Sequence, residues 1–111
     1  MLRHRLLYFG ESAGEKQGKL LRRIRKEKYD PNLYLVALPL WDNNQLEIYP
    51  ALTFKEPYFK EADVRIVGIA LGKDEATALV ETIVGDVYAE TGGTDMRRYF
   101  QKDEESSWQS F

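Results

Sequence analysis

The clearest hydrophobic pattern in the chain lies in residues 75–91. Apolar side chains recur there at intervals of three and four residues, at Ala76, Leu79, Val80, Ile83, Val84, Val87 and Tyr88. This spacing places them on one face of a helix with roughly 3.6 residues per turn. Asp74 stands where an N-terminal cap is expected, and Gly92 and Gly93 follow as a stop signal. The pattern predicts an amphipathic helix with one broad buried face.

Other segments have the patterns of strands. Residues 64–71 are apolar almost throughout and rich in β-branched side chains, which predicts a central strand, and Gly68 would let a helix or another backbone approach it closely. Residues 33–41 are apolar on both faces, and residues 45–49 alternate polar and apolar. Because residues 42–44 suit a tight turn, these two segments predict a hairpin. Residues 5–9 predict a first strand that ends at Gly10.

Residues 12–28 are expected to form the other helix. Ser12 and Glu15 have the spacing of a capping box, in which each side chain bonds the backbone of the other residue. The apolar stripe of this helix is narrow, with Leu20, Leu21 and Ile24, and its opposite side carries Lys19, Arg22, Arg23 and Lys26. The pattern predicts a helix that packs by a thin edge and displays a cationic ridge.

Together these elements follow the order βαβββα, which predicts a two-layer α+β sandwich. We expect a mainly antiparallel sheet of about four strands with both helices on one face. A strand at residues 96–100 would bring the order close to a ferredoxin-like fold. Residues 50–63 contain Pro57 and are expected to be irregular or to hold one helical turn, as core, lid or interface. Residues 1–101 are expected to form a single domain, and residues 102–111 an acidic, flexible tail whose only anchors are Trp108 and Phe111.

Composition narrows the chemistry. The chain has 111 residues, 43% of them hydrophobic, no Cys and a single His. The absence of Cys excludes disulfides, a thiolate nucleophile and iron–sulfur ligation, and one His leaves few metal or acid–base arrangements, so we expect no cofactor. The longest uncharged stretch, residues 31–41, is much shorter than the roughly 20 residues that span a bilayer. A cytoplasmic location without a membrane partner is therefore expected.

Candidate catalytic motifs are weak. Gly14, Gly18 and Lys19 resemble part of a phosphate-binding loop, but three residues separate the glycines instead of four, and Leu20 replaces the required Ser or Thr. The backbone amides of residues 10–14 could still hold an anion at a helix start. His4 lies close to the chain start, and the paired carboxylates lie in turns, a helix start or the tail. We therefore expect no enzymatic activity, and no residue is assigned to catalysis or to a metal.

Charge is distributed unevenly. Residues 1–32 hold nine Lys/Arg against four Asp/Glu, whereas the remaining residues hold seven against fourteen. A basic surface of this kind can contact a polyanion, or it can be neutralised within the fold or between subunits. The residues of a polyanion contact would be Lys19, Arg22, Arg23, Arg25 and Lys26. The sequence pI of about 5.5 counts against a nucleic-acid partner.

The leading hypothesis from sequence is a non-enzymatic protein-interaction or self-associating module. Its interface would use the two-sided apolar strand and the aromatic segment after it, with Tyr34, Leu38, Trp41, Phe54, Tyr58 and Phe59. The same side chains could instead fill the core, and Tyr49, Phe54, Tyr58 and Phe59 could instead line a small-molecule pocket. Nucleic-acid or anion binding through the basic first helix is the alternative function. Sequence does not identify the partner, the process or the oligomer count.

Overall fold

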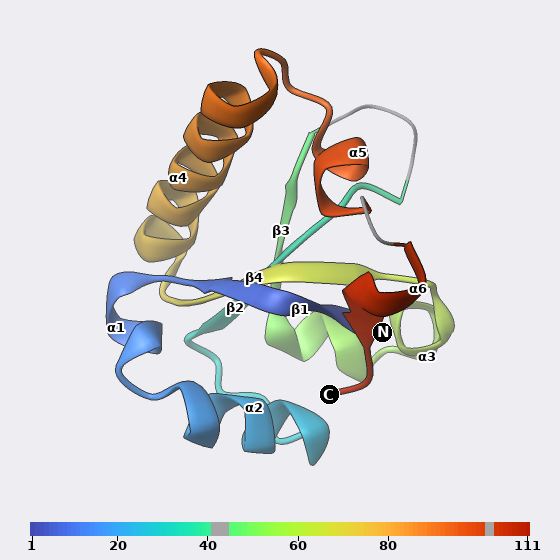
Figure 1. The fold of residues 1–111 in the computed structure, drawn as a ribbon. Helices are drawn as coiled ribbons and strands as arrows, with labels where there is room; N and C mark the ends of the chain where they lie inside the picture. The colour runs from blue at the N-terminus through green and yellow to red at the C-terminus, as the bar shows by residue number, and fades with distance from the viewer. Residues whose placement is uncertain (41–44, 102–103) are drawn as a thin grey trace.

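A five-stranded mixed sheet forms the centre of the protein (Figure 1). The computed structural model describes residues 1–40, 45–101 and 104–111. The strand order is β3-β2-β4-β1-β5. Strands β1 and β4 are parallel, and the other neighbours are antiparallel. The strands are β1 (Leu2–Phe9), β2 (Leu33–Ala37), β3 (Glu47–Pro50), β4 (Arg65–Leu71) and β5 (Trp108–Gln109). The α+β class is confirmed, whereas the sheet is mixed because a strand parallel to β1 lies at its centre.

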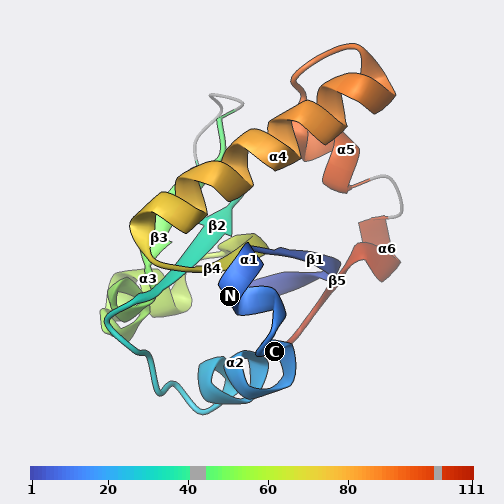
Figure 2. The ribbon, with the colours of Figure 1, turned by 90° about the vertical axis from the view of Figure 1, so that its left-hand side faces the viewer.

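Helices cover both faces of this sheet. They are α1 (Glu11–Gly14), α2 (Gln17–Arg25), the 3-10 helix η1 (Ala51–Lys55), α3 (Pro57–Glu61), α4 (Lys73–Thr91), α5 (Met96–Phe100) and α6 (Glu104–Ser107). Leu35 of β2 packs in one buried cluster with α2 and η1, and the next residue, Val36, packs in a second cluster with α4 and α5. Figures 1 and 2 show α4 and α2 on opposite sides of the sheet.

The predicted two-layer sandwich, with both helices on one face, is therefore wrong. A strand that is apolar on both sides needs cover on both sides, and in this structure the chain's own helices supply it. The ferredoxin-like variant is not found either, since that arrangement also leaves one sheet face without helices. In the part of the chain that the structure describes, both faces of β2 pack against the chain's own residues.

Strand β4 occupies the predicted central position, between β2 and β1. Val36 pairs with Gly68 and Ala37 pairs with Ile66, so Val67 is an extra residue in β4 that forms a bulge. A Cβ built on Gly68 would lie 2.9 Å from Cδ2 of Leu79 on α4. The prediction that this glycine allows close approach of a helix is confirmed.

The predicted helix over residues 12–28 is two helices. Gly10 is the N-cap of α1, so Ser12 lies inside the helix and makes no side-chain cap. The capping box is therefore wrong. A turn at residues 15 and 16 separates α1 from α2, where Leu20 and Ile24 are buried as the apolar stripe predicted. Glycines at positions 14 and 18 weaken helical continuity here, which favours the break.

The remaining segments divide between confirmed and corrected predictions. Helix α4 ends as predicted at Gly92, whose φ of 73° is left-handed, but its N-cap is Gly72, so Asp74 lies inside the helix and the predicted cap is wrong. Strand β2 pairs with β3 as a hairpin requires. Residues 42–44, the predicted turn, lie outside the described residues. Residues 96–100 form α5 and not a strand, because Met96 and Phe100, four residues apart, are both buried on one helix face. Residues 50–63 contain η1 and α3.

Part of the predicted tail packs on the sheet. In β5, Trp108 pairs with His4 of β1, which gives the sheet its fifth strand. Ser107 is buried, and Phe111 packs against the cluster that contains Leu35. Sequence predicted flexibility here because polar residues dominate the segment. The two aromatic side chains find positions that only the assembled sheet provides.

Candidate functional site

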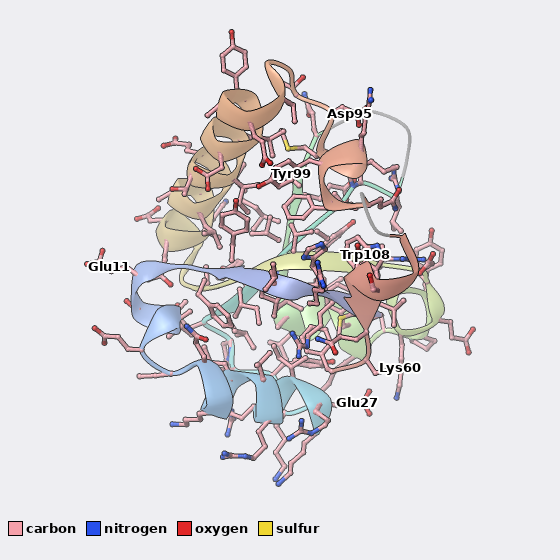
Figure 3. All side chains as sticks on the ribbon, in the orientation of Figure 1. Glu11, Glu27, Lys60, Asp95, Tyr99 and Trp108 are labelled. Carbon is pink, nitrogen blue, oxygen red and sulfur yellow. The ribbon has the colours of Figure 1, made fainter. Side chains whose placement is uncertain are left out.

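The exposed side of α2 carries a row of cations. Lys19, Arg22 and Lys26 follow one another at spacings of three and four residues, opposite the buried Leu20 and Ile24. All three are exposed, and none makes an ion pair or side-chain hydrogen bond with another described residue. Figure 3 shows nitrogen-tipped side chains extending from α2 away from the sheet. We call Lys19, Arg22 and Lys26 the cationic face of α2.

The two other predicted contact residues are engaged within the chain. Arg23 is half-buried, and its Nη2 lies 3.0 Å from Oδ1 of Asp30. Arg25 donates from Nη1 to the carbonyl oxygen of Phe111 at 3.2 Å. Both side chains therefore have structural partners, and the surface available to a ligand narrows to the cationic face.

Acidic side chains are concentrated on α4, across the sheet from α2. Residues 73–91 hold five Asp/Glu against one Lys, whereas residues 16–28 hold seven Lys/Arg against one Glu. Because the two helices lie on opposite faces of the sheet (Figure 2), the charges of one cannot pair directly with those of the other in the same molecule. The uneven charge along the sequence therefore becomes a separation of charge across the folded domain, with basic α2 on one side of the sheet and acidic α4 on the other.

The predicted anion cradle at residues 10–14 is filled by the chain's own carboxylate. Glu75 accepts hydrogen bonds from the backbone amides of Ser12 at 2.8 Å, Ala13 at 3.3 Å and Leu71 at 2.7 Å. Burial raises the pKa of Glu75, but these hydrogen bonds outweigh it and hold the pKa below its ordinary value. The amides at the start of α1 are therefore not available to a free anion while Glu75 remains in place.

The predicted interface residues divide into three groups. Leu38 and Phe54 are each only 1% exposed, so they fill the core and cannot meet a partner. Tyr34 and Phe59 are half-buried and pack against the two core clusters. Tyr58 is 60% exposed, and Trp41 lies outside the described residues. The described residues of this set do not form one apolar surface, because Tyr34 and Phe59 pack against different clusters on opposite faces of the sheet.

The aromatic rings of this segment pack against one another, and Phe54 also borders a cavity of about 290 Å³. The rings of Tyr49 and Phe54 have centroids 5.5 Å apart, and the rings of Phe54 and Phe59 lie 6.1 Å apart. Tyr58 stacks edge-on against Phe59 at 5.0 Å. Tyr49 also donates its hydroxyl to Glu47, and burial raises its pKa. The four residues of the predicted small-molecule pocket therefore pack mainly against one another.

Two surface cavities lie at opposite ends of α4, away from the aromatic segment. One of about 520 Å³ lies where α4 leads into α5 and is lined by Thr91, Gly93, Asp95, Arg98 and Tyr99. A second, of about 480 Å³, lies between the end of β1 and the start of α4. Asp95 accepts a hydrogen bond from the Arg98 amide, which caps α5. Neither cavity was predicted from sequence. The first is lined by residues within 91–99, which carry no recognised binding motif, and the second brings together the end of β1 and the start of α4, which are distant in the chain.

His4, which was predicted to lie exposed near the chain start, packs against other parts of the fold and is held by hydrogen bonds. Its Nε2 donates to the carbonyl oxygen of Phe100 at 3.0 Å, and its Nδ1 accepts from the Leu6 amide at 3.2 Å. The ring also packs edge-on against Phe100 and Trp108. These two hydrogen bonds fit the neutral imidazole, and burial lowers the pKa of His4 despite the hydrogen bonds.

This position predicts a pH dependence of stability. The unfolded chain takes up a proton near pH 6.5 and the folded chain only at lower pH, so stability is complete above pH 6.5 and falls as pH drops below it. Because the chain has one His, its ring signals in NMR spectra give the folded pKa directly. We expect a midpoint below 6.5 and a smaller stability loss over this range in His4→Gln. A midpoint at or above 6.5 would contradict the assignment.

Within residues 1–40, 45–101 and 104–111 there is no group of three or more His, Asp or Glu that could hold a metal ion. No helix in this described part is long and apolar enough to cross a membrane. No family model, curated protein or solved structure is similar enough to this chain to count as a match. Among the described residues, the exposure and helical spacing of the cationic face of α2 make it the candidate site that the geometry favours.

Proposed function

We propose that this protein is a non-enzymatic protein-interaction domain that binds an acidic protein surface through the cationic face of α2. The observation that carries the proposal is that Lys19, Arg22 and Lys26 are exposed together and that none of them forms an ion pair with another described residue. Cations aligned on one helix face present a fixed pattern to a partner. They raise the rate of encounter with an acidic surface and help to select it.

Helix stability alone does not account for these cations. Basic residues near a helix C-terminus interact favourably with its dipole, and Arg22 and the C-cap Lys26 gain from this effect. Lys19, in contrast, is the third residue of α2, close to the positive end of the helix, where a cation is unfavourable. Its exposed position in line with Arg22 and Lys26 supports a role outside the helix.

An acidic protein fits this surface better than a nucleic acid does. The whole chain has a formal net charge of −2, and domains that bind nucleic acid usually carry a net positive field. The acidic residues of α4 would weaken the attraction of a long polyanion that extends beyond α2. A compact acidic surface that contacts α2 alone avoids this repulsion. Nucleic-acid binding through the same three residues is the competing outcome of the test.

Charge reversal tests the proposal. The double variant R22E/K26E should bind a short fluorescent glutamate peptide (called polyglutamate below) at 50 mM salt at least tenfold more weakly than the unchanged protein, because two attractive contacts become repulsive. The matched control K55E/R98E makes the same change in net charge on η1 and α5, and should bind with at most a twofold loss. The neutral variant R22Q/K26Q should fall between the two.

Fluorescence anisotropy at 50 mM and 200 mM salt supplies the measurement, with circular dichroism to show that each variant is folded. Binding should weaken as salt increases, because screening shortens the reach of exposed charges. A single-stranded oligonucleotide serves as the second probe. Equal losses in both double variants, or no binding of polyglutamate at 50 mM salt, would reject the proposal. Tighter binding of the oligonucleotide than of polyglutamate would favour nucleic acid instead.

A further inference from the structure

The outward side of α4 has the properties of a helix-docking surface. Asp74, Glu81 and Tyr88 lie on the side of α4 opposite the buried Leu79 and Ile83. Tyr88, which the spacing predicted on the buried face, is instead 61% exposed. The side chains of Asp74 and Glu81 make no hydrogen bond or ion pair with another described residue. An aromatic ring and two carboxylates thus face away from the rest of the chain.

Gly85 lies on this same side, in the interior of α4. A glycine there costs about 1 kcal/mol relative to alanine, and such a cost often has a packing reason. No atom lies within 4 Å of the position that a Cβ at Gly85 would occupy, so no described neighbour needs the space. The space is therefore available to a helix from outside the molecule.

The cationic face of α2 complements this side of α4 in charge. Gly18 is exposed on α2 and likewise has no atom within 4 Å of a built Cβ. Where a helix carries a glycine in place of a larger side chain, another helix can approach it closely. Because α2 and α4 lie on opposite faces of the sheet (Figure 2), this fit can be realised only between two molecules.

We infer that the acidic partner of α2 is α4 of a second copy of this chain. This inference rests on the function proposed above and names its partner. In the contact, Arg22 and Lys26 of one copy lie near Asp74 and Glu81 of the other, and Tyr88 offers a ring face to a cation. The low net charge of −2 keeps the repulsion between whole molecules small.

The geometry makes the assembly head-to-tail. Each copy uses α2 for one neighbour and α4 for another, so the two contacting surfaces differ and every added copy leaves one of each free. Such a contact forms a ring when the rotation between copies closes and an extending chain when it does not. The average mass in solution should therefore rise with concentration above 12.9 kDa, and added salt should reverse the rise.

Paired charge reversals test which surfaces meet. Light scattering or sedimentation velocity at low salt should show that R22E/K26E alone and D74K/E81K alone each associate about tenfold more weakly than the unchanged chain. Mixing the two variants should restore a complex, because the reversed α2 of one then faces the reversed α4 of the other. The control K55E/R98E should associate within twofold of the unchanged chain. A mixture that stays monomeric would reject the inference.

A substitution that leaves charge unchanged gives an independent test. Gly85→Leu should raise the thermal midpoint, because it removes a glycine from a helix interior where the structure leaves space. It should also weaken self-association at least fivefold, because the side chain holds the second helix away. A gain in stability without any loss of association would overturn the proposed packing.

Failure of this inference can be told from failure of the proposed function. A chain that stays monomeric at low salt, yet binds polyglutamate through Arg22 and Lys26, would refute self-association and leave an acidic protein as the partner. A chain that neither associates nor binds polyglutamate would refute both. Self-association that the charge reversals do not change would show that other surfaces are used, and it would also reject the inference.

Discussion

Replacing Glu75 with alanine should lower the free energy of unfolding by about 2–3 kcal/mol, since hydrogen bonds to a charged group contribute about 1.5–3 kcal/mol each. Three backbone amides, from Ser12, Ala13 and Leu71, would lose their acceptor together. The expected loss is below the sum because the Ser12 contact is exposed and water can replace it. Asp74→Ala removes a carboxylate one residue away that makes no described hydrogen bond, and should cost about 0.5 kcal/mol. Urea denaturation measures both.

A substitution at Gly10 tests the same role of Glu75, because a Cβ at this position would clash with Oε2 of Glu75. The φ of −64° and ψ of 169° at Gly10 suit alanine, so Gly10→Ala acts only by displacing the carboxylate. The single variant should lose about as much stability as Glu75→Ala, about 2 kcal/mol. In the Glu75→Ala background the same change should be nearly neutral. Additive losses would contradict the proposed role of Glu75.

The same carboxylate should contribute a pH dependence at acid pH. Because the pKa of Glu75 is lower in the folded chain than its ordinary value of 4.5, its contribution is present above pH 4.5 and is lost as pH falls through the folded value. The difference in free energy of unfolding between Glu75→Gln and the unchanged chain should therefore become smaller as pH drops below 4.5. This window is separate from that of His4, whose loss begins below pH 6.5.

Replacing Phe54 with alanine should cost about 3–5 kcal/mol, the usual range for a fully buried aromatic side chain. Phe54 is 1% exposed and packs against both Tyr49 and Phe59, so its removal leaves a cavity that its neighbours cannot fill without moving. Tyr58→Ala is the matched control from the same segment. Tyr58 is 60% exposed, so its replacement should lower the free energy of unfolding by less than about 1 kcal/mol.

The Phe54→Ala and Tyr58→Ala variants also distinguish a residue of the core from a residue of an interface. Sequence left both roles open for Phe54 and Tyr58, and burial assigns the first to the core. Thermal or urea denaturation at several protein concentrations measures the difference. A Phe54→Ala variant as stable as the unchanged chain would contradict this assignment. A loss that shrinks with dilution would show that an intermolecular contact contributes.

Predictions from sequence were correct where one local pattern had no competitor. The repeat in residues 75–91 is long and has a stop signal at Gly92, so only a helix satisfies it. The apolar run around Gly68 likewise predicted a central strand. The cationic face of α2 could also be predicted, because the spacing of Lys19, Arg22 and Lys26 is helical whether or not the helix begins at Ser12.

Predictions failed where the local signal had to be completed by a distant partner. Ser12 and Glu15 have the spacing of a capping box, yet Glu75, more than 60 residues away, supplies the carboxylate at the start of α1. Met96 and Phe100 fit a strand as well as a helix until burial on one side selects the helix. Both outcomes depend on neighbours that the segment itself does not specify.

The amino-acid sequence by itself determined the type of most elements and the charge that each helix carries, since periodicity and composition are properties of neighbouring residues. Only the tertiary structure decided which sheet face each helix covers, because a strand that is apolar on both sides accepts a helix on either. That choice placed basic α2 and acidic α4 on opposite faces. Long-range packing therefore separated charges that the sequence alone could equally have paired within one molecule.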